Sequence, residues 1–151
     1  MGPKFYKKYK KTEIKSSHFS HAKYLIIVES PSKCAKIEHF LGMDYCCIAS
    51  KGHLRQLKGL KSIDTKNSFS PSFTVLDEKK DHIQQMKKFI ERFDSNRIFL
   101  ATDDDREGEA IAWHICEIFN LPLHTPRIIF HEITKPAIVH AIENPTIINM
   151  N

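Results

Sequence analysis

The chain has 151 residues, of which 41% are hydrophobic and 27% are charged, a composition typical of one globular domain and not of a disordered chain. No apolar run approaches the length of a membrane span, and the basic N-terminus lacks the apolar stretch of a signal peptide. We therefore expect an intracellular protein without a membrane segment, either cytoplasmic, at the nucleoid, or nuclear.

The net charge of +5 is unevenly distributed along the chain. Residues 1–23 hold seven lysines and one acid, a charge of +6, which leaves −1 for the rest. Aromatic residues alternate with these lysines, so the segment can be a nucleic-acid-binding arm or a nuclear-localisation signal. A solvated, flexible extension is the simpler interpretation, and we expect residues 1–23 to be a basic flexible tail.

Residues 24–28 form a continuous apolar run rich in β-branched residues, which predicts a strand buried on both faces, as in a parallel sheet. Pro31 then favours a helix start, with Ser30 as its cap, and the helix is expected to run to about Leu41, where Gly42 ends it. Residues 45–49 are a second strand candidate.

Residues 51–73 are rich in Lys, Gly, Ser and Pro and predict a long loop, followed by a short extended piece at 73–76. Apolar residues at helical spacing predict a helix over 81–93, and 97–101 is a further strand. A helix to about residue 119, a strand at 127–130 and a last helix from Thr134 to about residue 143 complete the pattern. Alternating strands and helices predict an α/β domain with a mainly parallel sheet.

Seven residues after the strand at 97–101 carry the strongest chemical signal. Residues 103–109 contain five acids, one arginine and one glycine. Residues two apart in an extended segment face the same way, so Asp103 and Asp105 share a face that Glu107 can join, while Asp104 is expected to point away. Three carboxylates on one side suit Mg²⁺. An acid-rich helix start favoured by the helix dipole explains two or three of the acids but not five.

Two further segments follow other strands and complete the candidate site. Glu29, at the end of the first strand, can exchange a proton or bind a cation, and Lys33 in the first helical turn calls for an anion such as phosphate. Taken alone, this pair would be a structural salt bridge. The loop at 50–55 contains Gly52, His53 and Arg55, a weak phosphate-binding signal. Ligands bind at the carboxyl ends of strands in such sheets, where these segments begin.

These motifs together resemble the Toprim domain of type IA DNA topoisomerases, over roughly residues 24–151. The resemblance is carried by the runs at 28–33 (VESPSK), 52–54 (GHL), 101–114 (ATDDDREGEAIAWH) and 130–135 (FHEITK). The first of these and the segment at 73–75 are closer to bacterial-type topoisomerase I than to topoisomerase III. The expected fold is the Rossmann-like Toprim fold, with a central, mainly parallel sheet of about four strands flanked by helices.

The resemblance implies an enzyme that relaxes negatively supercoiled DNA by transient single-strand breakage, through a 5′-phosphotyrosyl link, and strand passage. By matching position, Glu29 would handle the proton of the leaving 3′-hydroxyl and Lys33 would stabilise charge on the phosphate. Mg²⁺ would be held by Asp103, Asp105 and Glu107, with Glu29 as a further candidate ligand. Arg106 and Glu109 would support this geometry, and Arg106 is a candidate phosphate contact with His53 and Arg55.

The family's nucleophilic tyrosine lies in a later domain, and no tyrosine of this chain matches its motif. The four candidates are Tyr6, Tyr9, Tyr24 and Tyr45. We therefore expect a Toprim domain at 24–145, with 146–151 beginning a missing downstream domain, and a chain that binds Mg²⁺ and does not cut DNA alone. Its partners would be single-stranded DNA at the cleavage site and the gate domains carrying the tyrosine. Two alternatives stay open: a stand-alone Mg²⁺ and nucleic-acid binding module, and a Toprim primase or nuclease.

Overall fold

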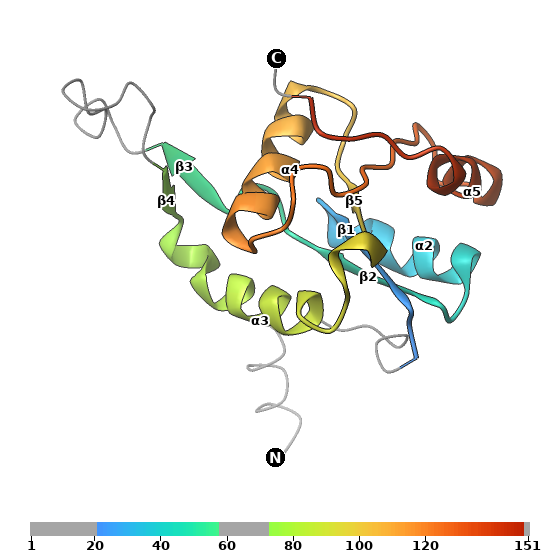
Figure 1. Ribbon diagram of the computed structural model, residues 1–151, viewed down its shortest axis with the longest axis horizontal. Coiled ribbons are helices and arrows are strands. Elements are labelled where there is room, and N and C mark those ends of the chain that lie inside the picture. Colours follow the sequence, from blue (N-terminus) through green and yellow to red (C-terminus); the bar gives the residue numbers. More distant parts are fainter. Residues whose placement is uncertain (1–20, 58–72, 150–151) are drawn as a thin grey trace.

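A computed structural model of the chain describes residues 21–57 and 73–149 (Figure 1). Three parallel strands form its centre: β1 (Tyr24–Val28), β2 (Tyr45–Ala49) and β5 (Ile98–Ala101), in the order β2-β1-β5. All of their residues are buried except the first of β1 and of β2, which confirms strands covered on both faces. Nearly all of the predicted basic tail lies outside the described residues.

The edge of the sheet beside β5 is occupied by residues 126–128. The Leu100 amide donates to the carbonyl of Pro126 and the Ile128 amide donates to that of Leu100, both at 2.9 Å. The strand predicted at 127–130 is therefore reduced to an isolated parallel bridge at Arg127, whose backbone also exchanges two hydrogen bonds with Thr146. Pairing on both sides of Arg127 supplies the fourth position of the predicted sheet, but only over this short stretch.

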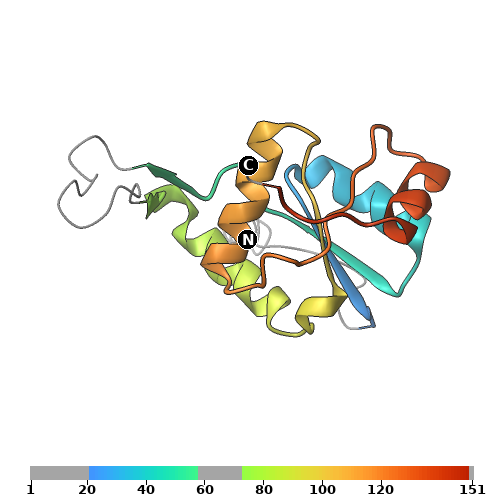
Figure 2. The ribbon, with the colours of Figure 1, turned by 45° about the horizontal axis from the view of Figure 1, so that its top comes forward.

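Helices cover both faces of the sheet, as Figure 2 shows. On one side lie α2 (Cys34–Leu41) and α5 (Lys135–Glu143), and on the other lie α3 (Lys80–Ile90) and α4 (Arg106–Ile118). Alternate residues of β1 divide between two cores, because successive strand residues point to opposite faces. Leu25 and Ile27 join the core beneath α3 and α4, and Ile26 and Val28 join the core beneath α2 and α5. This three-layer arrangement confirms the predicted α/β class.

The helix ends differ in part from their predictions. The segment after β1 begins with a single 3-10 turn, η1 (Pro31–Lys33), before α2, and Ser30 makes no side-chain capping hydrogen bond. The Ser30 hydroxyl is instead 2.9 Å from that of Ser32, so the predicted cap is wrong. Gly42 ends α2 with φ +86°, a conformation that glycine adopts at no steric cost, and Thr134 caps α5, both as predicted.

A two-stranded antiparallel hairpin extends from the body of the domain (Figure 1). It consists of β3 (Arg55–Leu57) and β4 (Phe73–Val75). The sequence predicted the extended piece at 73–76 but placed 55–57 in a loop. Two 3-10 turns, η3 (Asp77–Lys79) and η4 (Ser95–Arg97), precede α3 and β5. The rest of the predicted loop, 58–72, lies outside the described residues.

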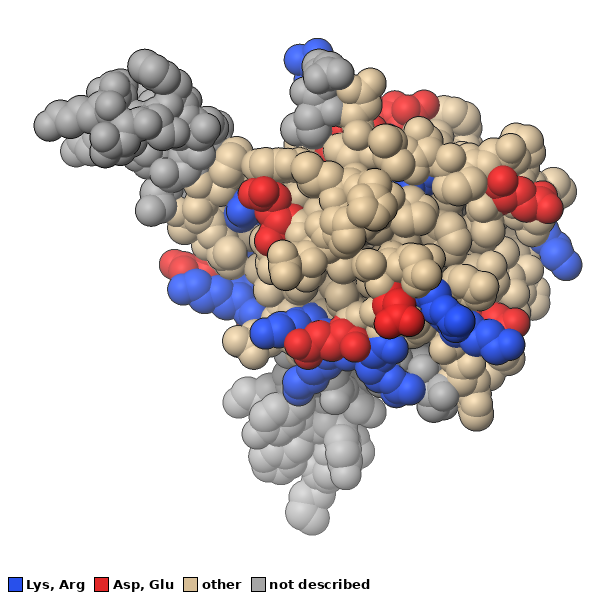
Figure 3. Space-filling model, viewed as in Figure 1, with Lys and Arg blue, Asp and Glu red and all other residues tan. Residues whose placement is uncertain are grey.

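The described surface shows a band of lysine and arginine interleaved with acids along α3, at the lower edge of Figure 3. Mixed signs of this kind are typical of a solvated helix face. Within the same residues all four cysteines are free, and Cys46, Cys47 and Cys116 are buried. None of the helices found in 21–57 and 73–149 has the length and hydrophobicity required to cross a bilayer.

Candidate active site at the carboxyl edge of the sheet

The three segments that carry the candidate residues meet at one edge of the sheet. In the parallel register, Val28 lies beside Ala49 on one side and beside Ala101 on the other, so the carboxyl ends of all three strands are level. Glu29 therefore follows β1 at the same height at which the 50–54 loop follows β2 and the acidic segment follows β5. The backbone links two of these segments, because the Gly52 amide donates to the Glu29 carbonyl at 3.2 Å.

The acidic segment turns into α4 through a tightly closed loop. Asp105 is the N-cap of α4, and its Oδ1 accepts a hydrogen bond from the Gly108 amide at 2.6 Å. A Cβ at position 108 would overlap the Asp103 backbone, lying 2.7 Å from its carbonyl carbon and 2.9 Å from its nitrogen. The Thr102 hydroxyl donates to the Gly108 carbonyl at 2.8 Å. The glycine is thus required by the close approach of the Asp103 backbone.

A buried arginine holds this loop from beneath. The Arg127 side chain is 2% exposed and pairs through Nη1 with Glu109 Oε1. Its Nη2 donates to the Asp103 carbonyl at 2.5 Å, and its Nε donates to the Thr102 hydroxyl at 3.2 Å. The other Glu109 oxygen accepts from the Asn149 amide at 2.6 Å. A buried guanidinium needs such complete pairing, because an unpaired buried charge is strongly destabilising.

Glu29 and Lys33 both contact Asp103. The Asp103 amide donates to Glu29 Oε1 at 2.6 Å, and Lys33 Nζ lies 3.3 Å from Asp103 Oδ1. Lys33 therefore projects from the first turn after β1 toward the acidic loop and not back to Glu29, so the i, i+4 salt bridge considered from sequence is not formed. The Glu29 carboxylate and the Lys33 ammonium thus both lie within hydrogen-bonding distance of Asp103, the first residue of the acidic loop.

The three acids predicted to share a face each have a different partner. Asp103 pairs with Lys33, Asp105 caps α4, and Glu107 Oε1 lies 3.3 Å from His53 Nε2. Asp104 is turned aside as predicted, with Oδ2 3.7 Å from His131 Nε2. Over residues 21–57 and 73–149, no three His, Cys, Asp or Glu side chains are grouped closely enough to enclose a metal ion.

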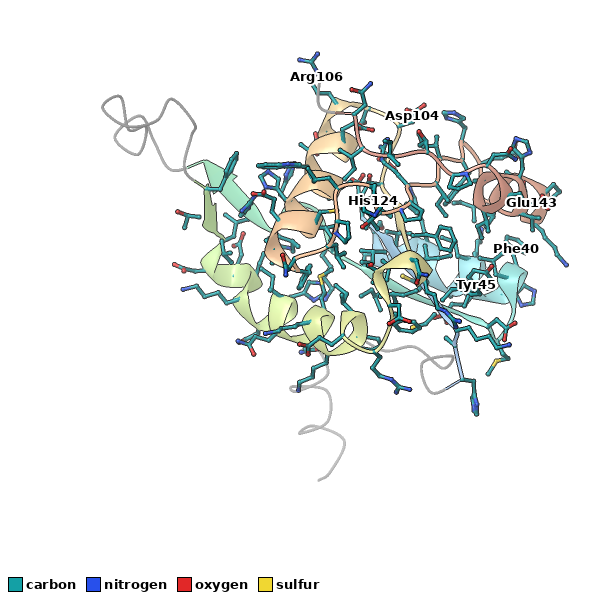
Figure 4. All side chains as sticks on the ribbon, viewed as in Figure 1. Phe40, Tyr45, Asp104, Arg106, His124 and Glu143 are labelled. Atoms are coloured by element: carbon teal, nitrogen blue, oxygen red, sulfur yellow. The ribbon has the colours of Figure 1, made fainter. Side chains whose placement is uncertain are left out.

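The three predicted phosphate contacts fall in different environments. His53 faces Glu107, as described above. Arg106 is exposed at the start of α4 and projects into solvent near Asp104 (Figure 4). Arg55 is 14% exposed, and two of its nitrogens already have partners: Nε donates to His114 Nδ1 at 2.5 Å and Nη2 to Glu117 Oε1 at 2.9 Å. These roles stay predictions, and for Arg55 the geometry favours attachment of the hairpin to α4.

The Arg55 guanidinium is enclosed by aromatic rings. Its central carbon lies 4.8 Å from the Phe73 ring centroid and 5.1 Å from that of Trp113, within cation–π range. Burial, and then the nearby Arg55 charge, lower the pKa of His114 to about 4. His114 is therefore neutral at physiological pH and accepts the Arg55 hydrogen bond at Nδ1, which leaves its proton on Nε2.

The two tyrosines in the described part of the chain lie far from this edge. Tyr24 and Tyr45 begin β1 and β2, at the amino ends of the strands, and their rings stack at 5.0 Å. A five-residue strand spans roughly 16 Å, so neither hydroxyl can reach the acidic loop. Figure 4 shows Tyr45 across the molecule from Asp104 and Arg106. Tyr6 and Tyr9 lie outside the described residues.

Sequence reasoning missed two residues of this site, Arg127 and His114. Arg127 was assigned only to the strand predicted at 127–130, with no role in the site. An arginine opening an otherwise apolar run, 25 residues after Thr102, was the available signal. His114 was given no role from the sequence. It lies five residues after Glu109 and therefore on another face of α4.

The fold and the site together define an α/β domain whose doubly covered parallel sheet carries Glu29 after one strand and an acidic loop after another. The model for the Toprim domain matches residues 24–133, and the chain belongs to this family. The match begins at the first residue of β1 and ends just before α5. The resemblance to the Toprim domain and the α/β fold class, both inferred from the sequence, are thereby confirmed.

Two relatives narrow the comparison. The chain is 46% identical over 134 residues to DNA topoisomerase 1 of Campylobacter jejuni, covering 85% of this chain and 19% of that protein. It is also similar to the full-length topoisomerase I structure from Thermotoga maritima, with a TM-score of 0.72 and 38% identity, over 83% of this chain and 21% of that one. The chain thus spans about a fifth of the length of these relatives.

Proposed function

We propose that this chain is the Toprim part of a type IA DNA topoisomerase, which relaxes negatively supercoiled DNA by transient single-strand breakage and strand passage. The observation that carries the proposal is the convergence of Glu29 and Lys33 on Asp103 at the carboxyl edge of the sheet. The similarity to two topoisomerases at 46% and 38% identity supports it. Such an enzyme works in whichever compartment holds the DNA.

The proposed chemistry is a transesterification: a tyrosine oxygen bonds to a backbone phosphorus and gives up its proton to solvent, while the bond from that phosphorus to the 3′-oxygen breaks. Glu29 supplies the proton that the leaving oxygen requires. Its Oε1 already accepts the Asp103 amide, so the proton belongs on Oε2. Lys33 is 36% exposed, so its ammonium can turn from Asp103 to a phosphate oxygen and stabilise the negative charge that develops there.

The donors at this edge fit Mg²⁺. Asp103 and Glu107, 52% and 68% exposed, offer hard carboxylate oxygens, and Mg²⁺ typically binds through one or two carboxylates while keeping several waters. Binding of Mg²⁺ therefore does not require protein ligands that already surround the ion on all sides. We propose Asp103, Asp105 and Glu107 as the ligands, with Glu29 close enough to join them. When bound, the ion would neutralise phosphate charge beside the reacting oxygen during religation.

The nucleophile of the proposed reaction comes from outside the described edge, because Tyr24 and Tyr45 lie at the opposite ends of their strands. The partners are therefore a single-stranded DNA segment and gate domains that carry the tyrosine. Of the alternatives, the primase or nuclease and the stand-alone binding module have less support, since the relatives compared here are topoisomerases.

The deciding experiment uses the longer polypeptide that contains this chain. Glu29→Gln should abolish cleavage and relaxation of supercoiled DNA while DNA binding is retained, and Glu143→Gln, an exposed acid on α5, is the matched control. Unimpaired cleavage by Glu29→Gln would remove the proposed proton transfer. The 151-residue chain should leave supercoiled DNA intact in Mg²⁺, whereas metal-dependent nicking by this chain would favour the nuclease alternative.

A further inference from the structure

We propose that Arg127 is a positioning residue that sets the geometry of the acidic loop and, through it, the affinity for Mg²⁺. This inference rests on the proposed function only in taking the Asp103–Glu107 segment as the cation site. Arg127 does not contact the proposed ligands' carboxylates. It acts through backbone and support groups, namely the Asp103 carbonyl, the Thr102 hydroxyl and the Glu109 carboxylate.

The direction in which Arg127 pulls the loop decides where the Asp103 carboxylate can go. The Asp103 peptide is fixed on both sides, because its amide donates to Glu29 at 2.6 Å and its carbonyl accepts from Arg127 at 2.5 Å. Beneath it, Gly108 leaves no room for a downward shift. With its backbone held at three points, the Asp103 side chain leaves the loop in one direction, toward Lys33.

The planar fork of arginine is what this position requires. Three acceptors surround the guanidinium: the Thr102 hydroxyl just after β5, the Asp103 carbonyl in the acidic loop and the Glu109 carboxylate in the first turn of α4. A lysine ammonium carries the same charge but is a compact point donor and lacks the planar fork that spaces these bonds. The side chain is 2% exposed, so water cannot replace the missing bonds.

The backbone of Arg127 is itself fixed, so the guanidinium is aimed from a rigid base. The Arg127 amide donates to the Thr146 carbonyl at 2.8 Å, and the Thr146 amide donates back at 2.7 Å. Its neighbours Pro126 and Ile128 bond to Leu100 of the sheet. Support shells of this kind orient metal ligands, and their loss typically weakens metal binding roughly 10- to 100-fold.

The test is Arg127→Lys in this chain, with Mg²⁺ binding measured by calorimetry well below the unfolding temperature. The charge is retained, so a dissociation constant raised about tenfold or more would report lost geometry. A dissociation constant within about twofold of wild type would overturn the proposal. The same Mg²⁺ measurement can be made on the charge-balanced double variant Glu109→Gln with Arg127→Met. The fold often tolerates the replacement of a buried ion pair by neutral groups.

A purely structural role is separated by a destabilised control. Ile138→Ala empties a buried site in the core beneath α5 and should lower the unfolding temperature without changing Mg²⁺ affinity. Equal affinities for Ile138→Ala and Arg127→Lys would assign Arg127 to stability alone and reject the proposal. If instead the acidic loop is not a cation site, the wild-type chain itself would bind no Mg²⁺, and this result is distinct from a failure of the Arg127 proposal.

Discussion

Replacing Gly108 by alanine tests the closed geometry of the acidic loop. The new Cβ would overlap the Asp103 carbonyl oxygen and lie 2.7 Å from its carbonyl carbon, so the backbone must separate by clearly more than the roughly 0.7 Å that the carbon alone needs to reach the 3.4 Å of ordinary contact. The Asp103 carbonyl points at this position and also receives the Arg127 hydrogen bond. Movement of the loop therefore relieves the clash only by weakening that bond.

The expected cost follows from three opposing contributions. Overpacking against backbone costs about 1–3 kcal/mol. Loss of a hydrogen bond from a charged, buried donor costs about 1.5–3 kcal/mol. Alanine in place of glycine within a helix returns about 1 kcal/mol. The free energy of unfolding of Gly108→Ala should therefore fall by about 1.5–5 kcal/mol, although alanine is the better helix former at an ordinary helical position.

Urea denaturation followed by circular dichroism measures this difference, and Gly42→Ala is the matched control. A Cβ at Gly42 meets no atom within 4 Å, but its backbone (φ +86°, ψ −171°) lies in a region that is essentially restricted to glycine, so this variant should lose about 1–3 kcal/mol from backbone strain alone. Calorimetry should show weaker Mg²⁺ binding for Gly108→Ala alone. A Gly108→Ala chain that is as stable as wild type and binds Mg²⁺ equally would refute the argument from close backbone approach.

The remaining predictions concern pH, the metal and the hairpin. The pKa of His114 is lowered from 6.5 to about 4, so the stabilisation is present above pH 6.5 and is lost as pH falls toward 4, by at most about 3 kcal/mol. His114→Asn, which keeps an acceptor near Nδ1, should flatten this part of the stability profile, and an unchanged profile would contradict the assignment. Changing Asp103 and Asp105 to asparagine should abolish Mg²⁺ binding and leave the circular dichroism spectrum intact, since asparagine also caps helices; unchanged affinity would reject these ligands. Arg55→Ala should leave the salt dependence of DNA binding in the longer polypeptide unaltered, whereas a slope reduced by about one would restore its role as a phosphate contact.

Much of the fold could be predicted because its signals are local. A short, β-branched apolar run such as 24–28 favours a strand covered on both faces, and Thr134 before α5 is a cap whose partner lies three residues away. The strand β3 could not be predicted in this way. It has three residues, it is adjacent to a Lys- and Gly-rich segment, and its pairing with β4 depends on chain far away in sequence.

The candidate site, like the fold, could be predicted from the sequence only where its signals are local. Spacing within the acidic segment correctly turned Asp104 away from its neighbours, and strand ends correctly predicted that Glu29 lies beside that segment. Spacing could not distinguish a metal ligand from a helix cap, and Asp105 is a cap in this structure. The role of Arg127 could not be predicted, because it depends on the direction in which its side chain points at the edge of the sheet. That direction is determined by its bonds to Glu109 and Asp103.

The aromatic enclosure of Arg55 gives the protein a built-in optical probe. Trp113 is the chain's single tryptophan, and its ring centroid lies 5.5 Å from that of Phe73 on the hairpin and 5.1 Å from the Arg55 guanidinium. Its fluorescence is therefore sensitive to whether the hairpin is seated on α4. Stopped-flow emission on mixing with DNA would report hairpin release in real time, with no label attached and no other indole in the background.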